Sequence, residues 1–323
     1  MGGKESHGNG CDGLLPNSII MTSIVEHNGG NGAGQRICYN QVMVDQPLPL
    51  LTIAGSDSGG AAGAQADLKT WAALGAYGMS AITAVTAQNS VAVSQVHYLP
   101  PEMVAAQIDA VLSDYGAAAI KTGFLGRVDI IEAVAGRLAY WKTSEVFRKP
   151  QRSQPPIIVI DPVLVTHRGE AMFGPEVAAA YRERLFPLAD LVTPNLAEAA
   201  LLWATDDRPQ ASTPTGLPAV ARGLSPPVLV KGLRRGEKIV DAYWDGVEWT
   251  ELPQPRIDTI NTHGSGDTLS AAICAYRALS HAMARDWLDA IRQAQTFTHA
   301  AIRRGAGWRL GAGHGPLGHF GDE

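Results

Sequence analysis

Cysteine is scarce in this chain, and long apolar runs are missing. The 323 residues include three cysteines, and Cys11, Cys38 and Cys274 form no closely spaced pair that could hold a metal ion. This count excludes a disulfide-rich secreted domain, and a reducing cytoplasm is the expected location. No apolar stretch approaches the ~20 residues that a membrane-spanning helix needs, so we expect no membrane partner.

An excess of basic charge is also missing. The chain has 26 Lys and Arg against 31 Asp and Glu, which gives a formal net charge of −5. Proteins that bind nucleic acid by neutralising its phosphates carry the opposite sign, so no nucleic-acid partner is expected. Hydrophobic residues make up 46% of the chain and charged residues 18%, as in an ordinary soluble globular protein.

The first 48 residues differ from the rest of the chain. Residues 1–48 are rich in Gly, Asn and Ser, show no sustained periodicity and carry no long apolar core of a secretory signal. Such a segment buries too little apolar surface to order itself, which predicts a disordered N-terminal extension. A strand over 36–44 is the alternative. Residues 49–323 are predicted to form a single domain.

Short apolar runs alternate with helical patterns from residue 49 onward. This alternation predicts an α/β fold, with a mostly parallel central sheet covered by helices on both faces. Ligands of such sheets bind at the carboxyl ends of the strands. Asp245-Gly246 predicts a hairpin over 239–252, and two final helices are expected over 265–280 and 284–303. The predicted strands are 50–54, 80–85, 118–122, 157–161, 190–193 and 228–231, and the helices between them are 64–75, 101–114, 128–140, 175–186 and 195–204. Proline-rich stretches at 143–156 and 205–227 are expected to form loops, the second with one short helix.

A glycine-rich turn opens the first of the two final helices. Gly264, Ser265, Gly266 and Asp267 precede apolar residues at helical spacing. The first amides of a helix lack internal partners and lie at the positive end of its dipole, so they suit a phosphate or the oxyanions of a phosphoryl transition state. An acid beside this anion site can take the proton of an attacking hydroxyl. The arrangement is typical of a small-molecule kinase, although a plain turn with a first-turn aspartate is the simpler alternative.

A second glycine-rich segment lies near the other end of the domain. An apolar run reaches Gly55, a loop of small residues follows, and a helical stretch begins near Gln65. The segment is not a P-loop, because no Gly-Lys-Ser/Thr closes it, and its glycine spacing differs from that of dinucleotide-binding proteins. Asp57 and Gln65 are weaker candidates that could serve the loop alone.

Several motifs in order, from about Pro49 to Phe320, carry a resemblance to a known family. The chain resembles the hydroxymethylpyrimidine/phosphomethylpyrimidine kinases of thiamine biosynthesis, within the ribokinase superfamily. The resemblance implies a ribokinase-like fold, ATP as phosphate donor, Mg2+ as cofactor and a small pyrimidine as substrate. It also suggests a homodimer. The motifs are 51–89, with Gln65-Ala66-Asp67-Leu68-Lys69 and Thr86-Ala87-Gln88-Asn89, then Lys121-Thr122-Gly123, Ile160-Asp161-Pro162-Val163, Thr193-Pro194-Asn195, Val230-Lys231-Gly232, 261–272 and 311–317.

The resemblance assigns four residues to the substrate. Asp67 and Gln88 match residues that hydrogen-bond the pyrimidine's ring nitrogen and amino group, and the backbone near Gly55 and Val163 would flank the ring. An acid and an amide together can pair with donors and acceptors on one heterocycle edge. Alternatively, Asp67 caps its helix and Gln88 closes the turn that follows.

Nucleotide and metal residues also carry over. Lys231 would contact the nucleotide phosphates, and Asn195 and Glu198 would do so through magnesium, with Asp161 helping to hold the metal. Mg2+ favours carboxylate, water and phosphate oxygens. The alternatives are a capping arrangement between Asn195 and Glu198, which is compatible with the metal role, and a simple ion pair for Lys231.

Position 267 departs from the resembled family. Pyrimidine kinases usually carry Gly-Thr-Gly-Cys here, whereas this chain has Gly-Ser-Gly-Asp, as in the wider superfamily of sugar and pyridoxal kinases. We expect an ATP-dependent hydroxymethylpyrimidine kinase that also acts on the monophosphate, although a carboxylate would repel an incoming phosphate more than a thiol would. A pyridoxal or pyridoxine kinase is the alternative enzyme, and a non-catalytic pyrimidine sensor is the alternative of another class.

Overall fold

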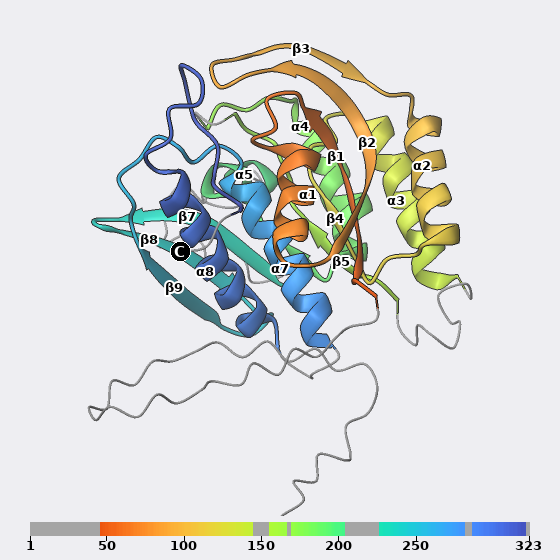
Figure 1. Ribbon diagram of the computed structural model, residues 1–323. Coiled ribbons are helices and arrows are strands. Elements are labelled where there is room, and N and C mark those ends of the chain that lie inside the picture. The colour runs from red at the N-terminus through yellow and green to blue at the C-terminus, as the bar shows by residue number, and fades with distance from the viewer. Residues whose placement is uncertain (1–45, 145–154, 167–168, 204–225, 282–285, 321–323) are drawn as a thin grey trace, which may run out of the picture. The chain divides into compact units, whose positions relative to one another are not determined.

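A single sheet organises the part of the chain that the computed structural model describes, namely residues 46–144, 155–166, 169–203, 226–281 and 286–320 (Figure 1). The expectations for 36–44, for nearly all of the N-terminal extension, and for most of 143–156 and 205–227 lie outside these residues. The nine strands lie in the order β3-β2-β1-β4-β5-β6-β7-β8-β9. They are β1 (Pro49–Asp57), β2 (Tyr77–Gln88), β3 (Val93–Tyr98), β4 (Ala119–Thr122), β5 (Ile157–Ile160), β6 (Leu191–Val192), β7 (Val228–Arg235), β8 (Lys238–Trp244) and β9 (Trp249–Pro255).

The six strands from β2 to β7 in this order are parallel, and antiparallel strands lie at both ends of the sheet. The predicted α/β architecture is therefore confirmed. The hairpin predicted over 239–252 is present as β8 and β9, joined at Asp245-Gly246. Because parallel strands end at a common edge, the residues after β1, β4, β5 and β6 come close together there.

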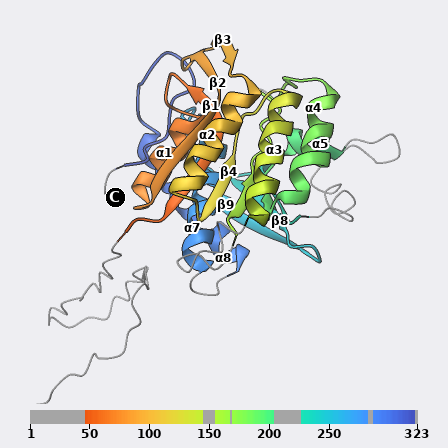
Figure 2. The ribbon, with the colours of Figure 1, turned by 90° about the vertical axis from the view of Figure 1, so that its right-hand side faces the viewer.

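Helices cover both faces of the sheet, as Figures 1 and 2 show. Side chains alternate along β1, so that Leu51 and Ile53 join one core cluster and Leu50 joins the other. The first cluster includes side chains of α2 (Pro101–Asp114), α3 (Val128–Thr143), α4 (Pro175–Ala180) and α5 (Leu196–Trp203). The second includes those of α1 (Gly63–Ala73), α7 (Ser265–His281) and α8 (Trp287–Gly305). None of these helices, within the described residues, is long and apolar enough to cross a membrane.

The sheet's edge differs from the prediction. β2 is longer than the predicted 80–85, and β3 was not expected at all. Side chains on both faces of β3 are largely exposed, so its sequence carries no buried apolar run that could reveal a strand.

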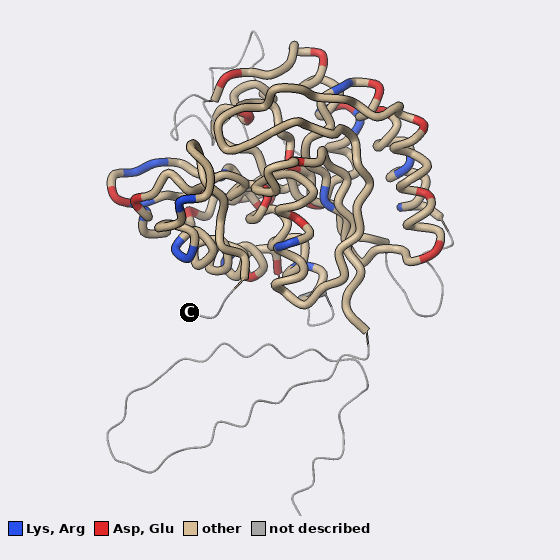
Figure 3. The backbone as a smooth tube through the Cα atoms, turned by 45° about the horizontal axis from the view of Figure 1, so that its top comes forward, with Lys and Arg blue, Asp and Glu red and all other residues tan. Residues whose placement is uncertain are grey.

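The helix predicted over 175–186 ends as an α-helix at Ala180 and continues as a π-helical turn and then a 3-10 turn that contains Pro187. Lysine, arginine and acidic positions are interspersed along the backbone (Figure 3).

Candidate active site

The two glycine-rich segments lie directly against each other. Gly264 has a φ of +82°, and a Cβ atom there would lie 1.8 Å from the carbonyl oxygen of Ala61. The loop after β1 therefore packs on the turn that opens α7, with no room for a side chain between them. Segments some 200 residues apart in the sequence thus form one site at the carboxyl edge of the sheet.

The turn at 264–267 opens α7 as predicted. The Ser265 amide donates to the Thr262 carbonyl at 3.1 Å, and the Thr268 amide donates to the Gly264 carbonyl at 2.8 Å. The Ser265 amide therefore already closes a turn, and the amides of Gly266 and Asp267 follow it at the positive end of the α7 dipole. A Cβ atom on Gly266 would lie 3.1 Å from Lys231 Nζ, so an ammonium group stands beside these amides.

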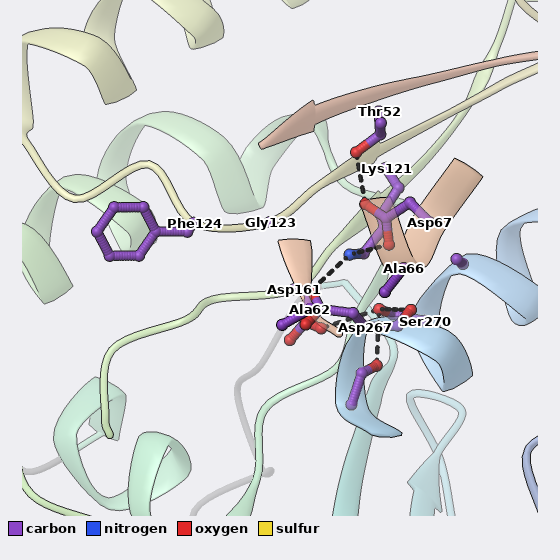
Figure 4. Close-up of polar contacts among 12 residues, drawn as sticks. Thr52, Ala62, Ala66, Asp67, Lys121, Gly123, Phe124, Asp161, Asp267 and Ser270 are labelled. Atoms are coloured by element: carbon purple, nitrogen blue, oxygen red, sulfur yellow. Dashed lines mark hydrogen bonds and ion pairs between the residues drawn. The ribbon is translucent and has the colours of Figure 1, made fainter. Parts of the chain in front are cut away.

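The carboxylate of Asp267 lies at the inner side of this turn (Figure 4). Its side chain is 15% exposed, and Oδ1 accepts a hydrogen bond from Lys121 Nζ at 3.0 Å. Burial acts to raise the pKa of Asp267, but Lys121, Lys231 and the Gly63 amide outweigh burial and lower the pKa below its ordinary value. Asp267 is therefore an ionised acceptor near neutral pH.

Asp67 has a different place from the one that the resemblance implies. Its side chain is fully buried, Oδ1 accepts from Lys121 Nζ at 2.6 Å, and Oδ2 accepts from Thr52 Oγ1 at 2.6 Å. Both oxygens are thus engaged inside the protein, and Asp67 lies within α1 rather than at its cap. In this structure the carboxylate presents no surface to a pyrimidine ring.

Gln88 ends β2 beside the α7 turn. Its Nε2 lies 3.0 Å from His263 Nε2, and its backbone exchanges hydrogen bonds with the Ser58 hydroxyl. The amide therefore links the second strand to the residue that precedes Gly264. Gly55 lies near the end of β1, where an added Cβ would come within 3.0 Å of the Phe124 ring. The backbone at Gly55 and the aromatic ring of Phe124 are thus in close apposition.

The loop after β1 is held by the residues proposed for that task. Asp57 Oδ1 accepts from the Gly59 amide, and Oδ2 accepts from the amides of Ala61 and Ala62. Gln65 accepts from the Asp57 amide and donates to the Ser56 hydroxyl. The interpretation that Asp57 and Gln65 serve the loop is confirmed.

The residues expected to serve the nucleotide lie just after β5 and β6 and within β7. Lys231 Nζ donates to Asp161 Oδ1 at 2.6 Å, and the Ser270 hydroxyl donates to Asp161 Oδ2 at 2.8 Å. The capping arrangement at α5 is present, since the Asn195 amide donates to Glu198 Oε2 and the Glu198 amide donates to Asn195 Oδ1. Burial raises the pKa of Glu198 to about 7, against the pull of Lys231.

These donors allow a test of the expected magnesium site. Asp161 uses both carboxylate oxygens on protein donors, and Glu198 likewise accepts from Asn195 and Leu164. Within the described residues, no three Asp, Glu, His or Cys side chains gather as a ready-made metal cage. The oxygens therefore suit Mg2+ bound through water and nucleotide phosphates, which is the mode that this ion favours. Val163 lies two residues after Asp161, and its amide donates to the Asp161 carbonyl.

Sequence reasoning missed Lys121, Thr52 and His263 as parts of this site. Lys121 stands inside a motif that supports the family resemblance, and a lysine at the end of a buried strand was the available signal. Its partners become visible only in the sheet register, in which Thr52 of β1 lies opposite Lys121 of β4.

The fold and the site define a ribokinase-like small-molecule kinase. This class is defined here by three features, namely a largely parallel sheet, two glycine-rich turns in contact at its carboxyl edge and an ionised acid at the start of α7. The family model described as phosphomethylpyrimidine kinase matches residues 57–318. The chain belongs to this phosphotransferase family.

Individual relatives support the same assignment. The hydroxymethylpyrimidine/phosphomethylpyrimidine kinase of Rhizobium meliloti is 43% identical over 84% of this chain and 96% of its own length. Among solved structures, the ADP complex of Bacillus subtilis pyridoxal kinase has a TM-score of 0.69 and 35% identity, and the match covers 85% of this chain and 98% of that one. Staphylococcus aureus pyridoxal kinase with AMP-PCP and pyridoxal has a TM-score of 0.69 and 31% identity, over 84% and 93% of the two chains.

Proposed function

We propose that this enzyme transfers the γ-phosphate of ATP to the hydroxymethyl oxygen of 4-amino-5-hydroxymethyl-2-methylpyrimidine, in thiamine biosynthesis. The observation that carries the proposal is the ionised Asp267 at the point where the two glycine-rich segments meet. Relatives named as kinases of this pyrimidine and its phosphate support the substrate. We infer a cytoplasmic location from the scarcity of cysteine, which cell fractionation can test.

Asp267 acts in this mechanism as the general base. The acceptor oxygen forms a bond to the γ-phosphorus while the bond to the β–γ bridging oxygen breaks and ADP leaves. The hydroxyl proton passes to the Asp267 carboxylate as the new bond forms, which is when a carboxylate of low pKa can receive it. Alignment and neutralisation of charge account for most of the acceleration in reactions of this kind.

The negative charge on the transferred phosphoryl group is neutralised by backbone amides and by a lysine. The amides of Gly264, Gly266 and Asp267 form the anion site at the α7 N-terminus, and the Ser265 amide holds this turn through its bond to the Thr262 carbonyl. Lys231, beside Gly266, neutralises the phosphate oxygens. Magnesium held through Asp161, Asn195 and Glu198 supplies further positive charge when it is bound.

The substrate ring lies at the carboxyl ends of β1, β2 and β5 in this proposal. The backbone of Gly55 and of Val163 flanks it, with Phe124 beside Gly55. The half-buried Gln88 amide contacts His263 and Thr86, and its second N–H and second lone pair serve the ring. Asp67 is not assigned to the ring, because both of its oxygens are engaged inside the protein.

Phosphorylation of the monophosphate is the second part of the proposal. An incoming phosphate must approach Asp267, and like charges repel each other. We therefore expect a lower kcat/KM for the monophosphate than for the alcohol. Asp267→Cys, which restores the residue usual in the family, should narrow that difference.

A pyridoxal kinase is the second candidate. Solved structures of this fold at 31–35% identity include pyridoxal kinases, and pyridoxal is also a flat heteroaromatic alcohol. The experiment that separates the candidates is mass spectrometry of phosphate transfer to hydroxymethylpyrimidine, its monophosphate and pyridoxal, side by side. We expect the highest kcat/KM with hydroxymethylpyrimidine. Preference for pyridoxal would favour the second candidate, and tight pyrimidine binding without ATP turnover would favour a sensor.

We also propose a homodimer formed through the edge of the sheet. Val93 and Val96 of the edge strand β3 are 52% and 41% exposed, and an edge strand with apolar side chains is a template for pairing with another chain. Light scattering should give the dimer mass for the unchanged chain and the monomer mass for Val96→Lys. A monomeric unchanged chain would contradict the proposal.

A further inference from the structure

A buried lysine lies behind the candidate base. Lys121 belongs to β4, and its side chain is 0% exposed. Nζ donates to Asp67 Oδ1 at 2.6 Å on one side and to Asp267 Oδ1 at 3.0 Å on the other (Figure 4). Burial alone would lower the pKa of Lys121, but Asp67, Asp267 and Asp161 outweigh burial and raise it, so the side chain stays an ammonium.

The Asp67 carboxylate explains how the Lys121 ammonium is tolerated inside the protein. A lone buried charge is strongly destabilising, whereas a paired and hydrogen-bonded one is tolerated. Asp67 of α1 supplies the counter-charge, and the Thr52 hydroxyl of β1 occupies its other oxygen. Burial raises the pKa of Asp67 to about 7, against the pull of Lys121, so the counter-charge is complete on the alkaline side of neutral pH. Thr52 and Lys121 are also direct neighbours in the parallel register of β1 and β4. The Asp67–Lys121 pair is therefore fixed by three elements.

Only the last member of this chain of contacts reaches the surface of the site. Asp67 and Lys121 are both 0% exposed, whereas Asp267 is 15% exposed. The contacts thus run from the interior to one oxygen of Asp267. The charged and polar groups that act on Asp267 are Lys121 from β4, Lys231 from β7 and the Gly63 amide at the start of α1. Lys121 and the Gly63 amide both hydrogen-bond the Asp267 carboxylate, and Lys121 does so with a fully buried side chain.

We propose that Lys121, held by Asp67, is a positioning residue for Asp267. The ammonium fixes Oδ1 and so turns Oδ2 toward the acceptor hydroxyl. Lys121 also pairs with Asp67, so its charge lowers the pKa of Asp267 less than an ammonium paired with Asp267 alone would. Asp267 thus gains a hydrogen bond and keeps part of its basicity. This inference rests on the proposed kinase function, and it gives Asp67 a task other than contact with the ring.

The test replaces Lys121 and Asp67 in one variant. Lys121→Met alone would leave the buried Asp67 uncompensated and could unfold the protein, so the main variant is Lys121→Met with Asp67→Asn, which keeps an acceptor for Thr52. Thr70→Val is the matched control, since Thr70 is a buried α1 residue whose hydroxyl bonds the Ala66 carbonyl in its own helix. Circular dichroism verifies the fold of each variant.

Kinetics distinguish positioning from substrate contact. We expect kcat of the double variant to fall about 100-fold, as for a misplaced catalytic group, with the KM of the pyrimidine and the Kd of ADP changed less than about twofold. In an Asp267→Asn background the same two changes should cause no further fall in kcat, because Lys121 acts through Asp267. A raised KM with unchanged kcat would overturn the proposal, and so would an additive fall in the Asp267→Asn background.

A crystal structure of the double variant provides a readout that does not depend on turnover. We expect the Asp267 carboxylate to leave its single position or to occupy several. An unchanged carboxylate position would overturn the role of Lys121 even if the enzyme proved to phosphorylate another alcohol. Absence of turnover by the unchanged enzyme would instead contradict the proposed function alone.

Discussion

At the scale of single residues, the decisive feature is a carboxylate whose ionisation is set by its neighbours. Asp267 is largely buried, yet its pKa is lowered by Lys121, Lys231 and the Gly63 amide. A lowered pKa means that the carboxylate loses its charge only at a pH below the ordinary aspartate value of ~3.9. The base therefore keeps its charge near neutral pH.

The pH dependence of turnover follows from this sign. With nucleotide and alcohol saturating at every pH, kcat should show no acid-side fall from Asp267 between about pH 8 and pH 5. The measurement is a kcat–pH profile on the unchanged enzyme. An acid-side inflection near pH 6 that Asp67→Asn displaces would show that the acidic pair, rather than a permanently ionised Asp267, controls catalysis.

Gly264 provides a test of the contact between the two glycine-rich segments. Its φ is +82°, and an added Cβ would lie 1.8 Å from Ala61 O, so Gly264→Ala strains the backbone and forces the segments apart. We expect a loss of at least ~2 kcal/mol in the free energy of unfolding. Gly307→Ala is the control, since an added Cβ there meets no atom within 4 Å. Equal stability of the two variants in urea would contradict this packing.

At the scale of elements, α5 begins with a reciprocal pair of hydrogen bonds. Asn195 and Glu198 each accept the other's backbone amide. Asn195→Ala should lower the free energy of unfolding by ~1 kcal/mol, whereas Asn195→Ser, which keeps a cap acceptor, should restore most of it. The measurement is urea unfolding of both variants. Equal losses would mean that the cap does not stabilise α5.

The same pair separates structure from metal binding. If Asn195 also serves magnesium, Asn195→Ser should raise the Mg2+ concentration for half-maximal activity while leaving stability near that of the unchanged chain. A variant that is unchanged in both respects would remove Asn195 from the nucleotide site.

Elements with a strong local signal could be predicted from the sequence. β1, α1 and α7 combine apolar periodicity with glycine-rich turns, and they lie within a few residues of the predicted ranges. β3 could not be predicted, because its side chains are mostly exposed and nothing in its sequence marks a buried face. At the site, local chemistry alone predicts that Gly264 and Asp267 lie where a helix begins, and α7 begins there. The pairing of Asp67 with Lys121 could not be predicted, since it depends on the register of β1 against β4.

At the scale of the whole molecule, the fold brings the two ends of the kinase domain into one site. The loop after β1 and the turn before α7 pack against each other, and α1 donates the Gly63 amide to Asp267 of α7. Helix α1 and helix α7 lie on the same face of the sheet in Figure 1. The shared site thus results from the order of strands in the sheet rather than from either segment alone.

Replacement of the candidate base is the most direct test of this account. Asp267→Asn keeps the size of the side chain and removes its ability to take a proton. We expect kcat for hydroxymethylpyrimidine to fall by ~10²–10⁴ while the Kd of ADP changes little. An Asp267→Asn enzyme that turns over at the rate of the unchanged enzyme would contradict the account.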